Sequence, residues 1–385
     1  MTPGARVAAA TEIIDAIAGG RAAEQALTRW ARNSRFAGSK DRAALRDHVF
    51  DVLRNWRSDA VRGGGDTGRA RMIGRLRDLG IEPADMFTGQ GHAPSVLTEE
   101  EKASGDMPET PGDLWNLQDW LVPHFKESLG EDAERTAMAL ATRAPVTLRV
   151  NRTRSTVDQA QAALLSEGVS TVRNTRAETA LTVTEGARRV RLSQAFADGL
   201  IELQDASSQA AVAGFQQAGR ALDFCSGGGG KALALAAQGW AVTAHDIDPE
   251  RMRDLPARAA RGGHSIDICP PDKVGAAGQF HLVFCDAPCS GSGTWRRTPD
   301  AKWALTQDRL TALQQMQADV LDTAVAHVAP GGVLAYATCS VLAVENAVQV
   351  SAFCARHPGW RVVSTRTWPV DEDGDGFYLA CLQTA

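Results

Sequence analysis

The chain has 385 residues, of which 44% are hydrophobic and 23% charged, with a formal net charge of −5. This length exceeds one typical domain, and the composition excludes a disordered, collagenous or disulfide-stapled protein. The start, MTPGARVAAATEII, has neither a charged segment before a long apolar stretch nor an apolar run of about 18 residues. We therefore expect no signal peptide, no membrane partner and a cytoplasmic location with reduced thiols.

The amino-terminal part of the chain predicts a helical bundle. Apolar residues recur at helical spacing over 6–31 and 41–57, and Ser39 and Asp41 are available as helix starts. The run GGGDTG at 63–68 predicts a loop. Residues 88–112, rich in Gly, Pro, Ser and acids, predict a loop or linker.

Charge is distributed unevenly over this part of the chain. Residues 1–80 carry 15 Lys and Arg against 9 Asp and Glu, a net of +6, whereas residues 81–135 carry 3 against 13, a net of −10. Fourteen of the 15 cations are arginines, whose planar fork suits phosphate contacts. Solvated helix faces explain the same arginines equally well, so the sequence leaves both interpretations open.

The pattern changes from Pro145 onward. Residues 147–152 predict a strand, followed by a helix near 156–167 and strands near 180–192 and 200–203. This alternation predicts a small α/β subdomain.

A strand, a glycine-rich loop and a helix start follow one another over 221–237. ALDFC ends at Cys225 and SGGGGK ends at Lys231, before an Ala- and Leu-rich helix. Such a turn offers a ligand unpaired N–H groups, although its spacing matches neither GxGxxG nor GxxxxGK[ST]. The next strand ends at Asp246, roughly 20 residues further on, where an acid can bind both hydroxyls of a ribose. The pattern predicts a cofactor that contains a nucleoside.

Two cysteines leave the ends of two apolar strands. FHLVFC at 280–285 runs into DAPCS with Cys289, and VLAYA at 333–337 runs into TCS with Cys339. Both thiols are expected at the carboxyl ends of parallel strands, where open α/β sheets bind their ligands. A thiolate is a strong nucleophile near neutral pH, so two thiols in one crevice predict covalent chemistry with a separate role for each.

Cysteines also have roles other than catalysis. Free cysteine is often a core residue, and Cys225, Cys285, Cys354 and Cys381 lie in apolar runs. A disulfide between the two thiols that follow the strands is conceivable, but seven irregularly spaced cysteines do not resemble a secreted framework. The absence of a CxxC pair argues against a zinc cluster, and we expect no bound metal.

Together the motifs resemble a known family. DFCSGGGGK at 223–231, DAPCSGSG at 286–293, RRTPDAKW at 296–303 and ATCSV at 337–341 are similar to motifs of S-adenosylmethionine-dependent RNA cytosine-C5 methyltransferases. Within this family the match is best with the bacterial Sun/RsmB group. GDGFYLA at 374–380 agrees with it, as does QDASSQ at 204–209, which in the family lies beside the cofactor.

The resemblance implies an α/β fold in three parts. It places a helical NusB-like RNA-binding domain with an acidic linker at 1–135, an RRM-like α/β lobe at 136–204 and a Rossmann-like class I methyltransferase domain at 205–385. The likeness at 38–46 to the NusB-like domain favours small-subunit (16S) ribosomal RNA as partner of a monomeric enzyme. Candidates for RNA contacts are Arg149, Asn151, Arg152, Arg296, Arg297, Lys302 and Trp303, the first three fitting a strand edge equally well.

The same resemblance implies roles for the catalytic residues. Cys339 adds to C6 of cytosine, which activates C5, while Asp286 bonds N3 as negative charge develops. Cys289 acts in product release, and Lys231 lies in the active site. DNA cytosine-C5 methyltransferases instead attack with the cysteine of a Pro-Cys motif, here Pro288-Cys289, but they lack the Thr-Cys-Ser thiol. Its presence assigns the attack to Cys339.

The expected cofactor, S-adenosylmethionine, lies over the glycine loop with Asp246 at its ribose and Asp267 near its adenine. Asp272 is the alternative to Asp267, because the register of that strand is open. Gly228 replaces a proline that is usual in the family, which adds up to about 1 kcal/mol to the ordering cost of binding. The expected cofactor contacts are Asp223, Cys225, Ser226, Gly227, Gly228, Gly229, Gly230, Lys231, Asp246, Asp267, Asp286 and Pro288.

Two other functions fit parts of the sequence. An RNA-binding assembly factor without turnover is compatible with Gly228 and the acidic linker, and a transfer-RNA cytosine-C5 methyltransferase has the same catalytic motifs. The intact cysteines, Asp286 and Lys231 favour an active enzyme. The sequence does not specify the target cytosine.

Overall fold

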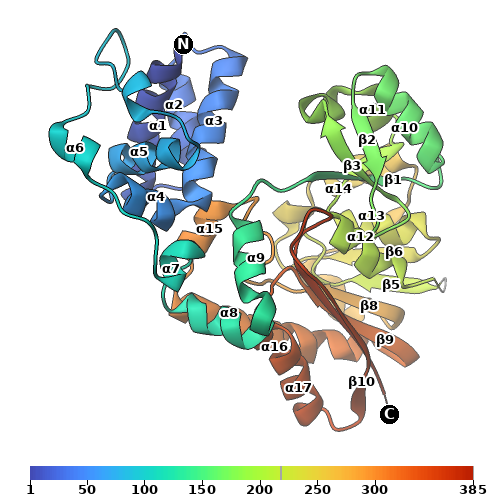
Figure 1. Cartoon of the computed structure of the whole chain (residues 1–385). Coiled ribbons are helices and arrows are strands. Elements are labelled where there is room, and N and C mark those ends of the chain that lie inside the picture. The colour runs from blue at the N-terminus through green and yellow to red at the C-terminus, as the bar shows by residue number, and fades with distance from the viewer. Residues whose placement is uncertain (217–218, 385) are drawn as a thin grey trace. The chain divides into compact units, whose positions relative to one another are not determined.

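The computed structural model describes residues 1–216 and 219–384, which divide into two compact units (Figure 1). The first unit consists of residues 1–143 and 295–304, and the second of 144–294 and 305–385. Within the described ranges, no helix has both the length and the apolar character needed to cross a membrane.

The first unit begins as a bundle of helices. Gly19 and Gly20, the latter with φ +93°, end the first helix, so the helical pattern over 6–31 is divided between two helices. The third helix begins at Ser39, and the loop predicted at 63–68 ends at Thr67, whose side chain caps the next helix. The helices are α1 (Pro3–Ala18), α2 (Ala23–Asn33), α3 (Ser39–Arg54), α4 (Trp56–Gly63), α5 (Gly68–Asp78), α6 (Glu99–Ala103), α7 (Pro111–Leu114), α8 (Leu121–Leu129) and α9 (Ala133–Leu140).

Most arginines of this unit are bound to its own acids. Arg57 contacts Asp113 at 2.7 Å and Asp119 at 2.6 Å, so the acidic segment neutralises part of the basic one. Arg69 binds Glu101 of α6 at 2.5 Å. Further ion pairs join Arg6 to Asp41, Arg46 to Glu24, Arg54 to Asp51, Arg62 to Asp78, Arg71 to Asp66 and Arg75 to Asp59. Arg57 and Arg69 thus link the basic segment to the acidic one, whereas the other six arginines pair with acids inside residues 1–80.

Residues 295–304, which follow the Cys289 motif, belong to the helical unit and include α15 (Pro299–Ala304). Arg54 of α3 donates from Nε to the carbonyl of Arg296 at 2.8 Å, and Trp303 Nε1 donates to the carbonyl of Leu53 at 2.7 Å. Arg296 and Lys302 are 2% and 1% exposed. The predicted RNA contacts of Arg296, Lys302 and Trp303 are thus replaced by anchoring contacts inside the unit.

The second unit contains the small α/β lobe. Its antiparallel strands have the order β2-β3-β1-β4. The strand expected near 180–192 ends at Glu185, because Gly186 adopts a left-handed conformation and a 3-10 helix follows. The elements are β1 (Val146–Val150), α10 (Val157–Ser166), β2 (Ser170–Arg173), β3 (Ala180–Glu185), α11 (Gln194–Ala197) and β4 (Ile201–Leu203), of which β2 was not predicted.

Polar side chains of the lobe bind the adjoining α/β part of the same unit. Arg149 donates to the carbonyl of Gly230 at 2.9 Å, and Asn151 donates to the carbonyl of Gly262 at 2.8 Å. Both side chains are buried, so they fix the lobe rather than contact RNA, whereas Arg152 is exposed.

A seven-stranded sheet with the order β10-β11-β9-β8-β5-β6-β7 forms the rest of this unit (Figure 1). Strands β5 to β9 pair in parallel, and the predicted antiparallel hairpin of β10 and β11 completes one edge. The elements are α12 (Ala206–Ala213), β5 (Arg220–Asp223), α13 (Gly230–Ala237), β6 (Ala241–His245), α14 (Leu255–Gly262), β7 (Ile266–Cys269), β8 (Phe280–Asp286), α16 (Gln307–Ala324), β9 (Val328–Thr338), α17 (Ala347–Arg356), β10 (Trp360–Trp368) and β11 (Phe377–Thr384).

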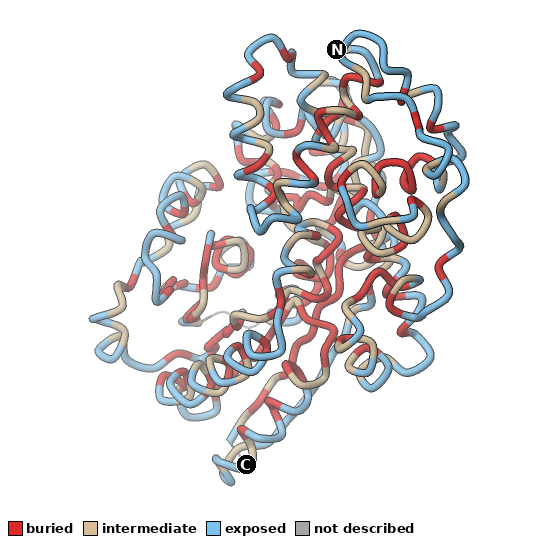
Figure 2. Tube along the Cα trace, turned by 90° about the vertical axis from the view of Figure 1, so that its left-hand side faces the viewer, coloured by how far each residue is buried: buried red, intermediate tan, exposed pale blue. Residues whose placement is uncertain are grey.

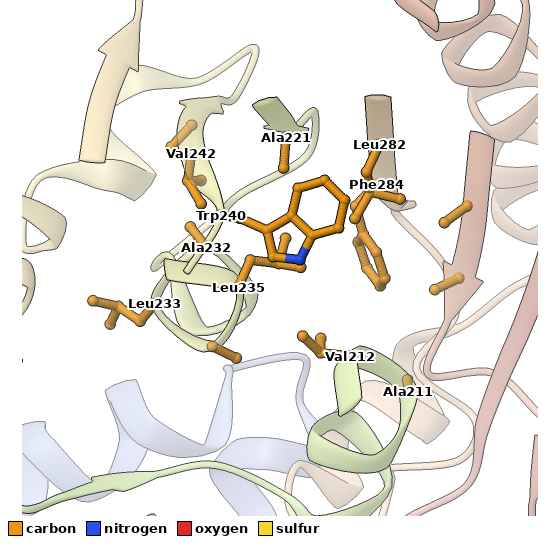
Figure 3. Packing of buried hydrophobic residues seen from close by; sticks show 14 of the residues in the cluster. Ala211, Val212, Ala221, Ala232, Leu233, Leu235, Trp240, Val242, Leu282 and Phe284 are labelled. Carbon is orange, nitrogen blue, oxygen red and sulfur yellow. The ribbon is translucent and has the colours of Figure 1, made fainter. Parts of the chain in front are cut away.

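The sheet is buried on both faces because alternate side chains point to opposite sides. Leu282 and Phe284 pack with α12, α13 and α14, whereas Val283 and Cys285 pack with α16 and α17. Figure 3 shows the indole of Trp240 within the first of these clusters, close to Leu235 and Phe284. The edge strand β10 is exposed over most of its length (Figure 2). The Rossmann-like fold predicted from the sequence is confirmed.

The buried Lys302 makes the stability of the protein depend on pH. Burial, with a smaller contribution from Arg54, lowers the pKa of Lys302 to about 7. Between that pH and the ordinary lysine pKa, the unfolded chain holds a proton that the folded chain lacks, so the unfolding free energy rises with pH over this window. Lys302→Met should flatten this rise by about 1.4 kcal/mol per pH unit.

Urea denaturation of the two proteins between pH 7 and 10 measures this slope. A Lys273→Met variant, changed at an exposed lysine, is the control and should follow the wild type. Parallel curves for wild type and Lys302→Met would show that Lys302 is charged in the fold.

Candidate active site

The predicted polar residues meet at the carboxyl edge of the parallel sheet. Asp223 and Asp286 end β5 and β8, while Asp246 and Cys339 directly follow β6 and β9. The register pairs Asp223 with Ala244 and Asp286 with Ala337, so these strand ends lie side by side. The site that the sequence predicts at separate positions is therefore assembled on one edge.

The two thiols are in contact. Cys289 Sγ and Cys339 Sγ lie 3.5 Å apart, and both cysteines are free and partly exposed. The hydrogen bond to Cys339, followed by burial, raises the pKa of Cys289 well above its ordinary value. A thiolate on Cys289 is therefore disfavoured while Cys339 lies beside it.

An ion pair borders the thiols. Lys231 Nζ lies 2.6 Å from Asp286 Oδ2 and 5.0 Å from the centre of the Phe377 ring. Burial opposes the charge of Lys231, but the attraction of Asp286 outweighs it and raises the lysine pKa. Asp223 is fully buried near this pair, and burial raises its pKa to about 7. The crevice thus holds the charged ammonium group of Lys231 near the carboxyl groups of Asp286 and Asp223.

The glycine loop is shaped by positions that require glycine. Gly227 and Gly229 have φ of +52° and +80°, and a Cβ at Gly229 would lie 2.3 Å from Leu255 Cδ1. Gly229 N donates to Ser226 O at 2.8 Å, and Arg258 binds the carbonyl of Gly228. The loop is therefore held in place although Gly228 replaces a proline.

Asp246 is nearly fully buried and already has polar partners. Its Oδ2 accepts from Gly227 N at 2.8 Å and pairs with Arg251 at 3.0 Å. A ribose hydroxyl would have to share this carboxylate with Arg251, whose side chain is 56% exposed and free to move aside.

The two candidates for the adenine contact lie at different places. Asp267 pairs with Thr243 inside the edge strand β7, two residues before its end, whereas Asp272 lies in the 3-10 helix Pro271–Ala276 beyond it. Asp272 therefore follows its strand as the other site residues do, whereas Asp267 does not.

Two other residues predicted to contact the cofactor, Cys225 and Pro288, make contacts within the fold. Cys225 packs against the core beside the sheet, and burial raises the pKa of its thiol. Pro288 accepts a hydrogen bond from Gln317 Nε2 at its carbonyl, at 2.9 Å. In residues 1–216 and 219–384, no three His, Cys, Asp or Glu side chains are grouped so that they could hold a metal ion.

Two features of the site were not predicted from the sequence. Gly293 and Gly376 approach so closely that Gly376 N donates to Gly293 O at 3.0 Å, which joins the closing motif to the Cys289 loop. Glu345 is fully buried next to the serines that follow the two cysteines. An acid within the apolar run VLAVEN was the only sequence signal for it.

Comparison with known proteins agrees with this geometry. Residues 211–383 match the family described as 16S rRNA methyltransferase RsmB/F, and residues 118–190 match the ferredoxin-like domain of these proteins. Ribosomal RNA small subunit methyltransferase B of Klebsiella pneumoniae is 34% identical over 390 residues, which are 89% of this chain and 90% of that protein. The chain belongs to this methyltransferase family.

A second relative carries the same name, and a solved structure shares the fold. The protein of the same name from Vibrio cholerae is 35% identical over 283 residues, 68% of this chain and 64% of that protein. A methyltransferase homolog from Pyrococcus horikoshii shares the fold, with a TM-score of 0.62 and 22% identity over 72% of this chain and 100% of that chain. This chain is therefore an S-adenosylmethionine-dependent methyltransferase.

The contact between Gly293 and Gly376 should tolerate no side chain. A Cβ at Gly293 would lie 2.4 Å from the carbonyl oxygen of Gly376, which is backbone and cannot move alone. We expect Gly293→Ala to lower the unfolding free energy by about 1–3 kcal/mol through overpacking. Urea denaturation measures the loss, with Gly359→Ala as the control because its Cβ would meet no atom within 4 Å. Equal stability of both variants would contradict the close approach.

Proposed function

We propose that this enzyme transfers a methyl group to C5 of a cytosine in RNA, through a covalent bond between Cys339 and C6 of the base. The pair of thiols 3.5 Å apart, beside the ion pair of Lys231 and Asp286, is the observation that carries the proposal. C5 of cytosine is a weak nucleophile, and addition of a thiolate at C6 supplies it with electrons.

Cys339 is assigned the attack because it belongs to the Thr-Cys-Ser motif at the end of β9 and lies beside the ion pair of Lys231 and Asp286. Its sulfur forms a bond to C6 while the C5–C6 double bond is broken, and electron density passes to C5 and N3. Asp286, held by Lys231, is assigned the hydrogen bond to N3. Because the target base must be reached at C6, it has to leave any stack in the RNA.

S-adenosylmethionine supplies an electrophilic methyl group when it is bound. Its nucleoside fits the loop Ser226–Gly230, where glycine leaves the backbone open to a ligand, together with the carboxylates of Asp246 and Asp272. Asp223 and Lys231 lie at the same strand ends and suit the charged groups of its amino-acid part.

Release of the product is assigned to Cys289. While Cys339 is free, its sulfur is the largest influence that keeps Cys289 protonated. Once Cys339 is bonded to carbon, that influence ends, so Cys289 can release its own proton to solvent, and the resulting thiolate takes the proton from C5. The electrons of the C5–H bond then restore the C5–C6 double bond, and the bond from sulfur to C6 breaks.

The proposed substrate is small-subunit ribosomal RNA, because the relatives are named ribosomal RNA small subunit methyltransferase B. Bisulfite sequencing of RNA from a strain without this gene separates this target from transfer RNA. We extend the proposal to a monomer in the cytoplasm, a reducing compartment that suits seven free cysteines.

The NusB-like part is proposed to bind RNA through one surface patch at the end of α2. Arg29, Arg32, Arg35 and Lys40 are exposed there and, within the described residues, form no ion pair. Phe36 among them is 77% exposed. Cations around an exposed aromatic ring suit phosphates and an unstacked base.

Substitution of each thiol separates its role. Cys339→Ala should abolish methylation and leave no covalent complex, because no other sulfur is assigned to C6. Cys289→Ala should instead accumulate enzyme bonded to methylated RNA, because the adduct forms but is not resolved. A denaturing gel with labelled RNA reads both outcomes, and Cys354→Ala is the matched control. Trapping by Cys339→Ala would reverse the assignment.

Asp246 and Arg251 should have opposite effects on cofactor binding. Asp246→Asn removes a charged acceptor and should weaken S-adenosylmethionine binding about tenfold or more, since hydrogen bonds to charged groups contribute about 1.5–3 kcal/mol. Arg251→Gln removes a competitor for this carboxylate and should maintain or tighten binding. Titration calorimetry measures both. Unchanged affinity of Asp246→Asn would remove the ribose assignment.

The α2 patch should contribute to affinity without contributing to chemistry. Changing Arg29, Arg32 and Arg35 together to Gln should weaken RNA binding and reduce the slope of log affinity against log salt by roughly 0.7 for each phosphate that is no longer neutralised. Cofactor binding should stay unchanged. Filter binding at several salt concentrations measures the slope, and Arg309→Gln, exposed in the second unit, is the control. An unchanged slope would move the RNA-binding role to other surfaces.

A further inference from the structure

Glu345 is a carboxylate in an unusual position. It ends a 3-10 helix, Ala343–Glu345, six residues after Cys339, and is 0% exposed. Within the part of the chain that the structure describes, no Lys, Arg or His forms an ion pair with it. Burial of a lone carboxylate costs several kcal/mol unless hydrogen bonds compensate for it, so the arrangement calls for a specific reason.

The hydrogen bonds of Glu345 connect the two cysteine loops. Its Oε1 accepts from Ser290 N at 2.8 Å and from Gln317 Nε2 at 3.0 Å. Its Oε2 accepts from the hydroxyls of Ser290 and Ser340, each at 2.5 Å. Ser290 directly follows Cys289 and Ser340 directly follows Cys339, so one carboxylate holds the residue next to each thiol.

We propose that Glu345 is a positioning residue that aligns the two cysteine loops and, by its negative charge, keeps the proton of the thiol pair on Cys289. The inference deepens the proposed function and rests on the roles assigned there to the two thiols. Glu345 forms no hydrogen bond with either thiol. It acts through its hydrogen bonds to Ser290 and Ser340 and through the electrostatic effect of its carboxylate.

The charges around the thiols support this role. Glu345 is among the groups that raise the pKa of Cys289, after the hydrogen bond to Cys339 and burial. Lys231 interacts with Cys339 from the other side of the pair, and Asp286 balances that lysine. Tyr336, whose hydroxyl donates to the carbonyl of Glu345 at 2.6 Å, is a further titratable neighbour, and burial raises its pKa well above the ordinary value. The Glu345 carboxylate, which accepts from the residue next to Cys289, therefore opposes formation of a thiolate on Cys289.

The pH dependence of alkylation at Cys289 tests the charge effect without requiring methylation. A Cys339→Ala background removes the hydrogen bond, and residue-resolved mass spectrometry follows the reaction of Cys289 with iodoacetamide. Adding Glu345→Gln should lower the midpoint of the rate profile by about one pH unit or more, the shift produced by removal of one nearby like charge.

Matched variants separate this charge from general loosening of the loops. Ser292→Ala removes a hydroxyl that bonds Ser340 at 2.9 Å and the Val341 N–H, but leaves Glu345 in place, so it should not move the midpoint. Glu345→Asp keeps the charge on a shorter side chain and should retain the midpoint. An unchanged midpoint with Glu345→Gln, or an equal shift with Ser292→Ala, would overturn the proposal.

Methylation kinetics test the alignment in the otherwise native enzyme. Glu345→Gln and Glu345→Asp should reduce kcat about tenfold or more, because misplacement of reacting groups by about 1 Å has large effects on rate, while S-adenosylmethionine affinity is retained. If Glu345→Gln does not fold, Glu345→Asp decides alone, and full activity of that variant overturns the positioning role. Wild type that methylates no cytosine would refute the proposed function, whereas the alkylation midpoints would still decide the role of Glu345.

Discussion

The parallel pairing of β8 with β9 is the constraint on which the site depends. Its register places Asp286 opposite Ala337, so the chains that leave the two strands carry Cys289 and Cys339 to the same point. Ala287 N donates to Ala337 O and Gly293 N donates to Cys339 O, both at 2.9 Å, which extends the pairing beyond the strands. A slip in this register would separate the thiols and remove Asp286 from Lys231, because each side chain is placed by its distance from a strand end.

The sheet and its polar edge could be predicted because their signals are local. Apolar runs such as FHLVFC define buried strands, and residues just after them must lie at one edge when the strands are parallel. This logic located Asp223, Asp246, Asp286 and both thiols. It misplaced the end of the short edge strand β7, which carries little apolar pattern, so Asp267 lies inside that strand. It also missed β2, in which Ser170 and Thr171 are half-buried and Val172 and Arg173 exposed.

The roles of charged residues could not be predicted in the same way. A sequence shows that Arg57, Lys302 or Arg149 is charged, but not which carbonyl or carboxylate it meets after folding. Those partners lie far away in the chain, so burial of the charge becomes visible only in three dimensions. Glu345 is an acid to which the same reasoning applies, since the four groups that donate hydrogen bonds to it come from three separate segments of the chain.

Because residues 295–304 belong to the helical unit, the amino-terminal helices cannot be separated cleanly from the methyltransferase part of this chain. The chain enters the helical unit at Trp295, six residues after Cys289, and re-enters the second unit at Leu305. The catalytic part is therefore not one continuous segment that recombination can transfer intact. Loss of the helices would leave Trp295, Arg296 and Lys302 without the neighbours that cover them. Removal of the amino-terminal helices from this chain would therefore require compensating changes within residues 295–304.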